Sequence, residues 1–169
     1  MKIFKLYNIV NGYKTIDFGE INITSISKGE IDIECLSNSN LNWKKTEDDL
    51  IPSDSPFFIG AFPIFEYSKI EKLNIPIDFV HFFVENVDFV AIKSNIIEIN
   101  VLNRDKSIMK LFKSGKIMSI NKYVFNKYNY PPIFRIKEYP LFTFVNEEIA
   151  ELLKNSNLKQ IKFEECEVI

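Results

Sequence analysis

The sequence predicts an α+β fold, made mostly of antiparallel β-sheet with two or three short helices packed on it. The first reason is composition. Isoleucine, phenylalanine, tyrosine and valine supply most of the 46% of residues that are hydrophobic, and such side chains suit strands. The second reason is that many short apolar runs end at turn residues, whereas helical periodicity is confined to a few segments. With 169 residues, we expect one compact domain, with an N-terminal β-hairpin region at 1–58 and an α+β region at 59–169.

The N-terminal third predicts hairpins followed by a loop. Asn11–Gly12 lies between apolar runs and predicts one hairpin, and residues 21–35 around Lys28–Gly29 predict a second. Residues 37–56 are polar and rich in Asn and Ser, which predicts a loop with a helical turn near 46–50.

The rest of the chain predicts alternating strands and helices. Apolar residues at helical spacing predict a helix over 63–74, and strand-like runs follow at 77–92 and 95–102. Ser114–Gly115 predicts a hairpin. From residue 133 onward, we expect a strand at 133–136, a bend at Tyr139–Pro140, a buried strand at 141–145, a helix capped by Asn146 and a closing strand after 157.

Few residues suit catalysis. His81 is the only histidine, the five glycines form no phosphate-binding loop, and Cys35 and Cys166 belong to no metal motif. We expect His81 to lie among aromatic side chains with one hydrogen bond, although a nucleophilic pair with Cys35 is an alternative. The expectation is therefore a protein that is not an enzyme and holds no cofactor or metal.

The charge is unevenly distributed. Residues 104–139 hold nine Lys or Arg and two acids, in a chain with a net charge of −2. The basic segment also contains Phe112, Tyr123, Phe125, Tyr128 and Tyr130, so it could hold single-stranded nucleic acid. The pI of about 5.6 argues against a dedicated nucleic-acid binder and favours a solvated face or a protein partner.

The acidic loop at 47–54 and its aromatic neighbours suggest a partner-binding surface. Acidic side chains would attract a basic partner, and aromatic side chains would anchor it. The candidate residues are Trp43, Glu47, Asp48, Asp49, Asp54, Phe57 and Phe58. The chain shows no export signal and no apolar run long enough to span a membrane, so we expect a cytoplasmic protein with no membrane association.

The order of sequence motifs in the second half of the chain resembles the order found in a known protein family. "INVLNRDKS" at 99–107 contains a Leu-x-x-x-x-Ser element, "IFRI" at 133–136 is followed by "LFTFV" and a helix, and "NLKQIKF" at 157–163 closes the pattern. This order of motifs is similar to that of the immunity proteins of bacterial polymorphic toxin systems, including the Myxococcus-type immunity domain. Asn103 and Gln160 stand where that family usually has an acid and a glycine. The resemblance implies a protein that binds a cognate toxin, such as a nuclease effector, and neutralises it by occluding its active site or an exosite.

Overall fold

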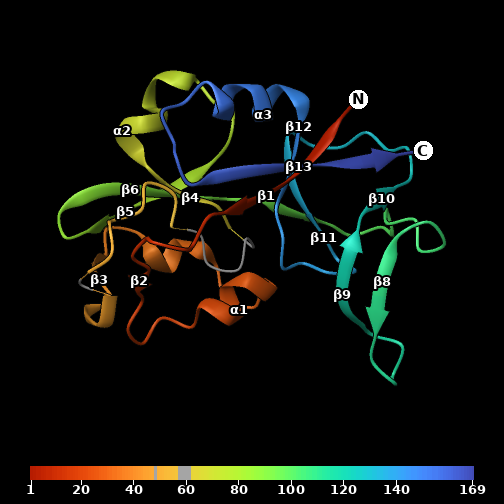
Figure 1. Ribbon diagram of the computed structural model, residues 1–169, viewed down its shortest axis with the longest axis horizontal. Helices are drawn as coiled ribbons and strands as arrows, with labels where there is room; N and C mark the ends of the chain where they lie inside the picture. Colours follow the sequence, from red (N-terminus) through yellow and green to blue (C-terminus); the bar gives the residue numbers. More distant parts are fainter. Residues whose placement is uncertain (48, 57–61) are drawn as a thin grey trace.

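The computed structural model describes residues 1–47, 49–56 and 62–169. Within them the chain forms an α+β fold of two larger sheets, one separate hairpin and three short α-helices (Figure 1). Seven of the ten pairings between strands are antiparallel. The predicted fold class is confirmed.

The first sheet joins the two ends of the chain. Its strands are β1 (Ile3–Asn8), β7 (Asn95–Ile97), β10 (Val124–Phe125), β11 (Ile133–Ile136), β12 (Phe144–Asn146) and β13 (Ile161–Val168), in the order β10-β13-β1-β12-β11-β7. The N-terminal strand β1 therefore lies between two C-terminal strands, and both termini lie at the same end of the molecule (Figure 1).

The second sheet contains the middle of the chain. Its strands are β2 (Ile16–Asp17), β3 (Asn40–Trp43), β4 (Ile64–Glu66), β5 (Phe79–Val84) and β6 (Val87–Ile92), in the order β2-β3-β5-β6-β4. Because β1 and β3 pair with strands that follow residue 59, the region 1–58 does not form a sheet of its own.

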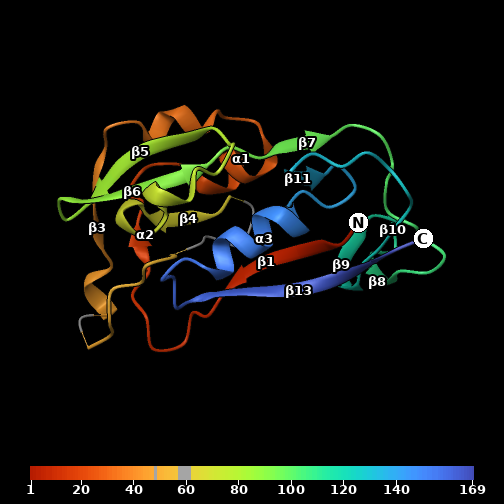
Figure 2. The ribbon, with the colours of Figure 1, turned by 90° about the horizontal axis from the view of Figure 1, so that it is seen from above.

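Helices cover both sheets, and a hairpin projects from the body. Helices α2 (Tyr67–Ile70) and α3 (Glu147–Lys154) lie on one side and α1 (Ile23–Lys28) on the other (Figures 1 and 2). The 3-10 turns are Ile33–Leu36, Lys45–Glu47 and Glu71–Leu73. Strands β8 (Ile108–Leu111) and β9 (Ile117–Lys122) pair only with each other. No helix among the described residues is long and apolar enough to cross a membrane.

Three apolar clusters hold these layers together. One packs α1 against the second sheet through Ile26 and Phe82. A second, rich in aromatic rings such as Phe125 and Phe144, packs Ile120 of the hairpin against the first sheet. The third contains residues of both sheets with α2 and α3, including Val90 from β6. Since the third cluster joins the two sheets, the described parts share one interior.

Both hairpins predicted for the N-terminal third are wrong. The turn at Gly12 exists, but β1 pairs with β12 and β13 instead of with the next segment. Residues 23–28 form helix α1: the side chain of Asn22 accepts a hydrogen bond from the Ser25 amide, and Gly29 ends the helix at a φ of 76°. An Asn cap and a left-handed Gly favour a helix over a β-turn here.

Several other predictions need smaller corrections. The helix predicted at 63–74 begins only at Tyr67, because Ile64–Glu66 is strand β4. The segment 37–56 contains strand β3 as well as a helical turn at Lys45–Glu47. The strand predicted over 77–92 is a hairpin that turns at Glu85–Asn86. The hairpin around Gly115, strand β11, helix α3 with its Asn146 cap and strand β13 are confirmed.

Candidate partner-binding surfaces

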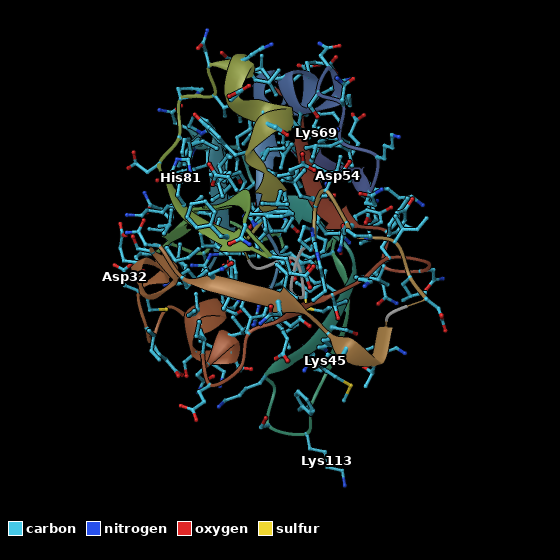
Figure 3. All side chains as sticks on the ribbon, turned by 90° about the vertical axis from the view of Figure 1, so that its left-hand side faces the viewer. Asp32, Lys45, Asp54, Lys69, His81 and Lys113 are labelled. Atoms are coloured by element: carbon cyan, nitrogen blue, oxygen red, sulfur yellow. The ribbon has the colours of Figure 1, made fainter. Side chains whose placement is uncertain are left out.

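A groove of about 470 Å³ lies at one end of the second sheet, and we call it the Trp43 groove. It forms where the segment 51–54 meets β3, β4, β6 and the residues before β13. Its lining residues are Tyr13, Trp43, Ile51, Pro52, Ser53, Asp54, Glu66, Lys69, Glu85, Val87, Phe89, Lys159 and Gln160. Figure 3 faces this end of the molecule and labels Asp54 and Lys69.

Asp54 fixes one wall of the groove. Its carboxylate accepts a hydrogen bond from the Lys159 amide at 2.9 Å, and its own amide donates to the side chain of Gln160 at 2.9 Å. Its carbonyl also accepts from the Glu66 amide at 2.8 Å. Asp54 and Gln160 are 8% and 3% exposed. These bonds join three distant segments, so the wall is held in place before any partner arrives.

The segment leading to Asp54 is also anchored by backbone bonds. Lys14 donates its amide to the carbonyl of Ile51 at 2.8 Å, and Ile51 donates to the carbonyl of Gly12 at 3.2 Å. The side chain of Ile51 nevertheless remains 65% exposed. An apolar side chain on a fixed backbone loses little conformational freedom when a partner covers it.

The groove combines apolar and charged surface. Ile51 and Val87 are exposed apolar side chains of its lining. The charged lining consists of Asp54, Glu66 and Glu85 with Lys69 and Lys159. The exposed carboxylate of Asp49 comes two residues before Ile51. The lining thus holds three carboxylates and two lysines, and one of the carboxylates, Asp54, is buried.

The predicted contact residues differ in their exposure and in how much of them the structure describes. Trp43 is 6% exposed and packs edge-on against Phe89 at 5.9 Å, so it supports the groove from the core. Asp54 is buried and used internally, as described above. Asp49 is exposed, as a contact residue requires. For Glu47 the structure describes the backbone turn. Asp48, Phe57 and Phe58 lie outside the described residues.

The sequence analysis did not assign Gln160, Ile51 or Val87 to a binding surface. Gln160 stands out in the sequence only because it replaces the glycine of the family pattern, and the structure shows it bonded to Asp54. Ile51 and Val87 carry no such signal, because isolated apolar residues beside a turn or strand end are usually buried. Only the tertiary arrangement leaves them exposed.

A second exposed surface lies on the β8–β9 hairpin. Its exposed apolar side chains are Ile108, Leu111, Phe112 and Met118, each between 45% and 58% exposed. Lys110, Lys113 and Lys116 accompany them on the hairpin. The hairpin extends away from the helices, and Lys113 lies at its tip (Figures 1 and 3). Lys122 differs from these lysines in bonding Glu167 at 2.7 Å, and this ion pair lowers the pKa of Glu167.

The aromatic residues of the basic segment do not form a stacking platform. Tyr123, Phe125 and Tyr130 are each at most 6% exposed and pack on other rings of the second cluster. Burial raises the pKa of the Tyr123 and Tyr130 hydroxyls. Only Phe112 and Tyr128 are exposed. Single-stranded nucleic acid binds along several exposed rings, and the basic segment offers only these two.

His81 has the surroundings expected from the sequence. Its Nδ1 lies 3.0 Å from a carboxylate oxygen of Asp88, and its ring packs edge-on against Tyr67 and Phe79. Desolvation and the nearby Asp32 raise the pKa of the Cys35 thiol, which keeps it protonated, whereas a nucleophilic cysteine needs a lowered pKa. No group of three or more potential metal ligands occurs in the described part of the chain.

The residues that resemble the immunity family have structural roles here. The side chain of Asn103 accepts from the Lys106 amide and donates to Asn126, while the Ser107 hydroxyl exchanges hydrogen bonds with the backbone of Val124. These contacts form the turn that leads into the hairpin. No protein family and no curated protein matches the chain, so the resemblance rests on the order of these motifs.

Proposed function

We propose that this protein is an immunity protein that binds a cognate bacterial toxin and neutralises it by covering its active site or an exosite. The single observation that most supports this proposal is the Trp43 groove. It joins a hydrogen-bonded frame to exposed apolar side chains and to charged side chains of both signs. The order of the family-like motifs in the second half of the chain supports the same function.

The groove suits recognition of a folded protein with a basic surface. A surface fixed by Asp54 and Gln160 binds with a small entropy loss. Apolar contacts at Ile51 and Val87 would supply affinity at the centre. Acidic groups around them would accelerate association with a nuclease, whose own surface must attract phosphate. The toxin in this proposal is a cytoplasm-acting effector, and the immunity protein would meet it in the cytoplasm.

The test measures binding to the product of the neighbouring toxin gene and protection of cells that express it. We expect Ile51→Asp to weaken binding at least tenfold, which is about 1.4 kcal/mol. Asp49→Lys should lower the association rate and reduce its dependence on salt. The matched controls are Ile99→Asp, at a residue 51% exposed, and Asp105→Lys, at an exposed residue. Neither control residue lines the groove.

The possible outcomes test toxin neutralisation separately from the surface that carries it. If the wild-type chain neither binds the toxin nor protects cells, the proposed function is overturned. If protection remains in the groove variants but is lost in Leu111→Asp, the protein is an immunity protein that uses the hairpin. Binding unaffected by every one of these variants would exclude both surfaces.

The exposed hairpin supports a second candidate, a binding module that uses the basic segment 104–139. Its lysines and apolar side chains fit an acidic protein surface. Replacing Lys110 and Lys113 by Glu would then abolish capture of such a partner without affecting the groove. Binding to a single-stranded oligonucleotide that falls steeply with salt would instead indicate nucleic acid as the partner.

A further inference from the structure

Arg135 is a buried cation at the junction of the two sheets. It lies in β11 and is 9% exposed. Its Nε donates to the carbonyl of Ser94 at 3.2 Å, and its Nη1 donates to the carbonyl of Ser27 at 2.6 Å. The side chain therefore connects β11 to helix α1 and to the residue before β7. Both partners are neutral carbonyl groups.

This guanidinium has no counterion in the described part of the chain. None of the ion pairs there includes Arg135. Burial lowers the pKa of the guanidinium, and no neighbouring carboxylate acts in the opposite direction. A buried charge is ordinarily paired, because its desolvation is costly. Arg135 thus lacks the group that usually accompanies such a residue.

The hydrogen bonding around Arg135 is also incomplete. No hydrogen bond to its Nη2 is made by the described residues. The hydroxyl of Ser27, whose carbonyl binds Arg135, is buried and has no partner among those residues. A guanidinium has five N–H donors arranged to match an oxyanion. Two of its nitrogens are used here, and the third has no partner among the described residues.

Arg135 lines a cavity of about 230 Å³. Ligand pockets for larger organic molecules usually span about 300–1,000 Å³, so this cavity suits a small ion or a single functional group. The charged lining residues besides Arg135 are Lys93 and Asp32. The carboxylate of Asp32 already accepts from the Glu34 amide at 2.9 Å, and Lys93 pairs with Glu34. Asp32 is the one acid among the described lining residues, and no ion pair joins its carboxylate to Arg135.

We propose that this cavity binds a small oxyanion, a carboxylate or a phosphate group, held by the guanidinium of Arg135 with help from Lys93. The bound group would supply the missing counterion and accept hydrogen bonds from Nη2 of the guanidinium. It would also stabilise the junction of α1, β7 and β11, because a ligand that binds only the folded state stabilises it. This proposal is independent of toxin binding.

The wild-type protein can be tested directly with inorganic phosphate and with acetate, against chloride at matched ionic strength. We expect saturable shifts of the Arg135 Nε–H resonance and of the Ser94 and Ser27 amides in NMR spectra, with a Kd at or below about 1 mM. The thermal midpoint should rise with the same ligand. A response to phosphate alone identifies a phosphate site, and a response to acetate alone identifies a carboxylate site.

Variants test whether Arg135 is the receptor. Arg135→Gln should abolish the shifts of the Ser94 and Ser27 amides, and Arg135→Lys should weaken binding because a lysine lacks the planar guanidinium. Lys93→Gln should weaken binding about two- to fivefold, in the range of a partly exposed charge contact. Lys122→Gln is the matched control, because Lys122 also pairs with a glutamate, Glu167, and does not line this cavity.

If Arg135→Gln does not fold, the titration of the wild-type protein and the Lys93→Gln variant still test whether the cavity binds an oxyanion. The proposal is overturned if neither ion shifts the Arg135 resonance beyond the chloride control. It is also overturned if the shifts are distributed over exposed lysines such as Lys113 and persist in Lys93→Gln at unchanged affinity. Arg135 would then act only as a cross-link between α1 and β11.

Discussion

Single polar side chains decide where several elements of this protein begin. Asn146 accepts a hydrogen bond from the Ile149 amide and starts α3, while Asn22 does the same for α1. Asp32 starts the 3-10 turn at Ile33–Leu36. Each satisfies an amide that a helix terminus leaves without a partner. The cap at Asn146 was predictable because two acids and an apolar stripe follow it, whereas α1 is too short to show a stripe.

At this scale we expect Asn146→Ala to lower the free energy of unfolding by about 1 kcal/mol, because the Ile149 amide loses its acceptor. Urea denaturation followed by circular dichroism measures the change. Asn155→Ala, at the opposite end of the same helix, is the control and should change stability by less than about 0.5 kcal/mol. Equal losses in both variants would show that the cap contributes nothing specific.

Elements of this chain are delimited by turns as much as by apolar periodicity. The apolar run 77–92 is one stretch in sequence but two paired strands in the structure, because Glu85 and Asn86 both adopt positive φ, at 49° and 67°. Positive φ at both central residues is typical of the two-residue turns that match strand twist. Glutamate is unusual there, so the turn was not recognisable from the sequence.

The turn gives a prediction for the hairpin. Glu85→Asn should raise the free energy of unfolding by about 0.5–1 kcal/mol, because asparagine tolerates left-handed backbone better than glutamate. Chemical denaturation measures the gain. Glu71→Asn provides the comparison, since Glu71 has a φ of −52° and is also exposed. A similar gain at Glu71 would contradict the conformational explanation.

At the scale of the whole molecule, burial of one thiol and two tyrosine hydroxyls makes stability depend on pH in the alkaline range. Burial raises the pKa of Cys166 to about 12 and also raises the pKa of Tyr123 and Tyr130. In the unfolded chain these groups titrate near pH 9 for the thiol and near pH 10 for the tyrosines. Above these values the unfolded chain binds fewer protons than the native protein, so stability must fall as the pH rises.

We therefore expect full stability from these groups below about pH 9 and a progressive loss toward about pH 12, with each group contributing up to about 1.4 kcal/mol per pH unit. Urea midpoints measured from pH 8 upward give the slope. Cys166→Ser removes the buried thiol and should make the decline shallower. A midpoint that stays constant up to about pH 11 would show that these groups are not retained in their protonated forms.

The fold class, strands β11 and β13, helix α3, the hairpin around Gly115 and the surroundings of His81 could be predicted from the sequence, whereas the strand predicted at 141–145 is only Phe144–Asn146. These features depend on local signals: apolar periodicity, a helix cap and turn glycines. A partner-binding surface was also predicted at the segment 47–54, and the Trp43 groove forms beside this segment.

The strand pairings and the burial of single residues depend on the tertiary structure, because the segments that come together are far apart in the chain. Strand β1 pairs with β12 and β13, and β3 pairs in parallel with β5, which no local pattern specifies. Trp43 is buried, whereas Ile51 remains exposed. Arg135 likewise becomes a buried cation without a counterion among the described residues only when α1 and β11 meet. Burial depends on which surfaces come together, and a single segment does not carry that information.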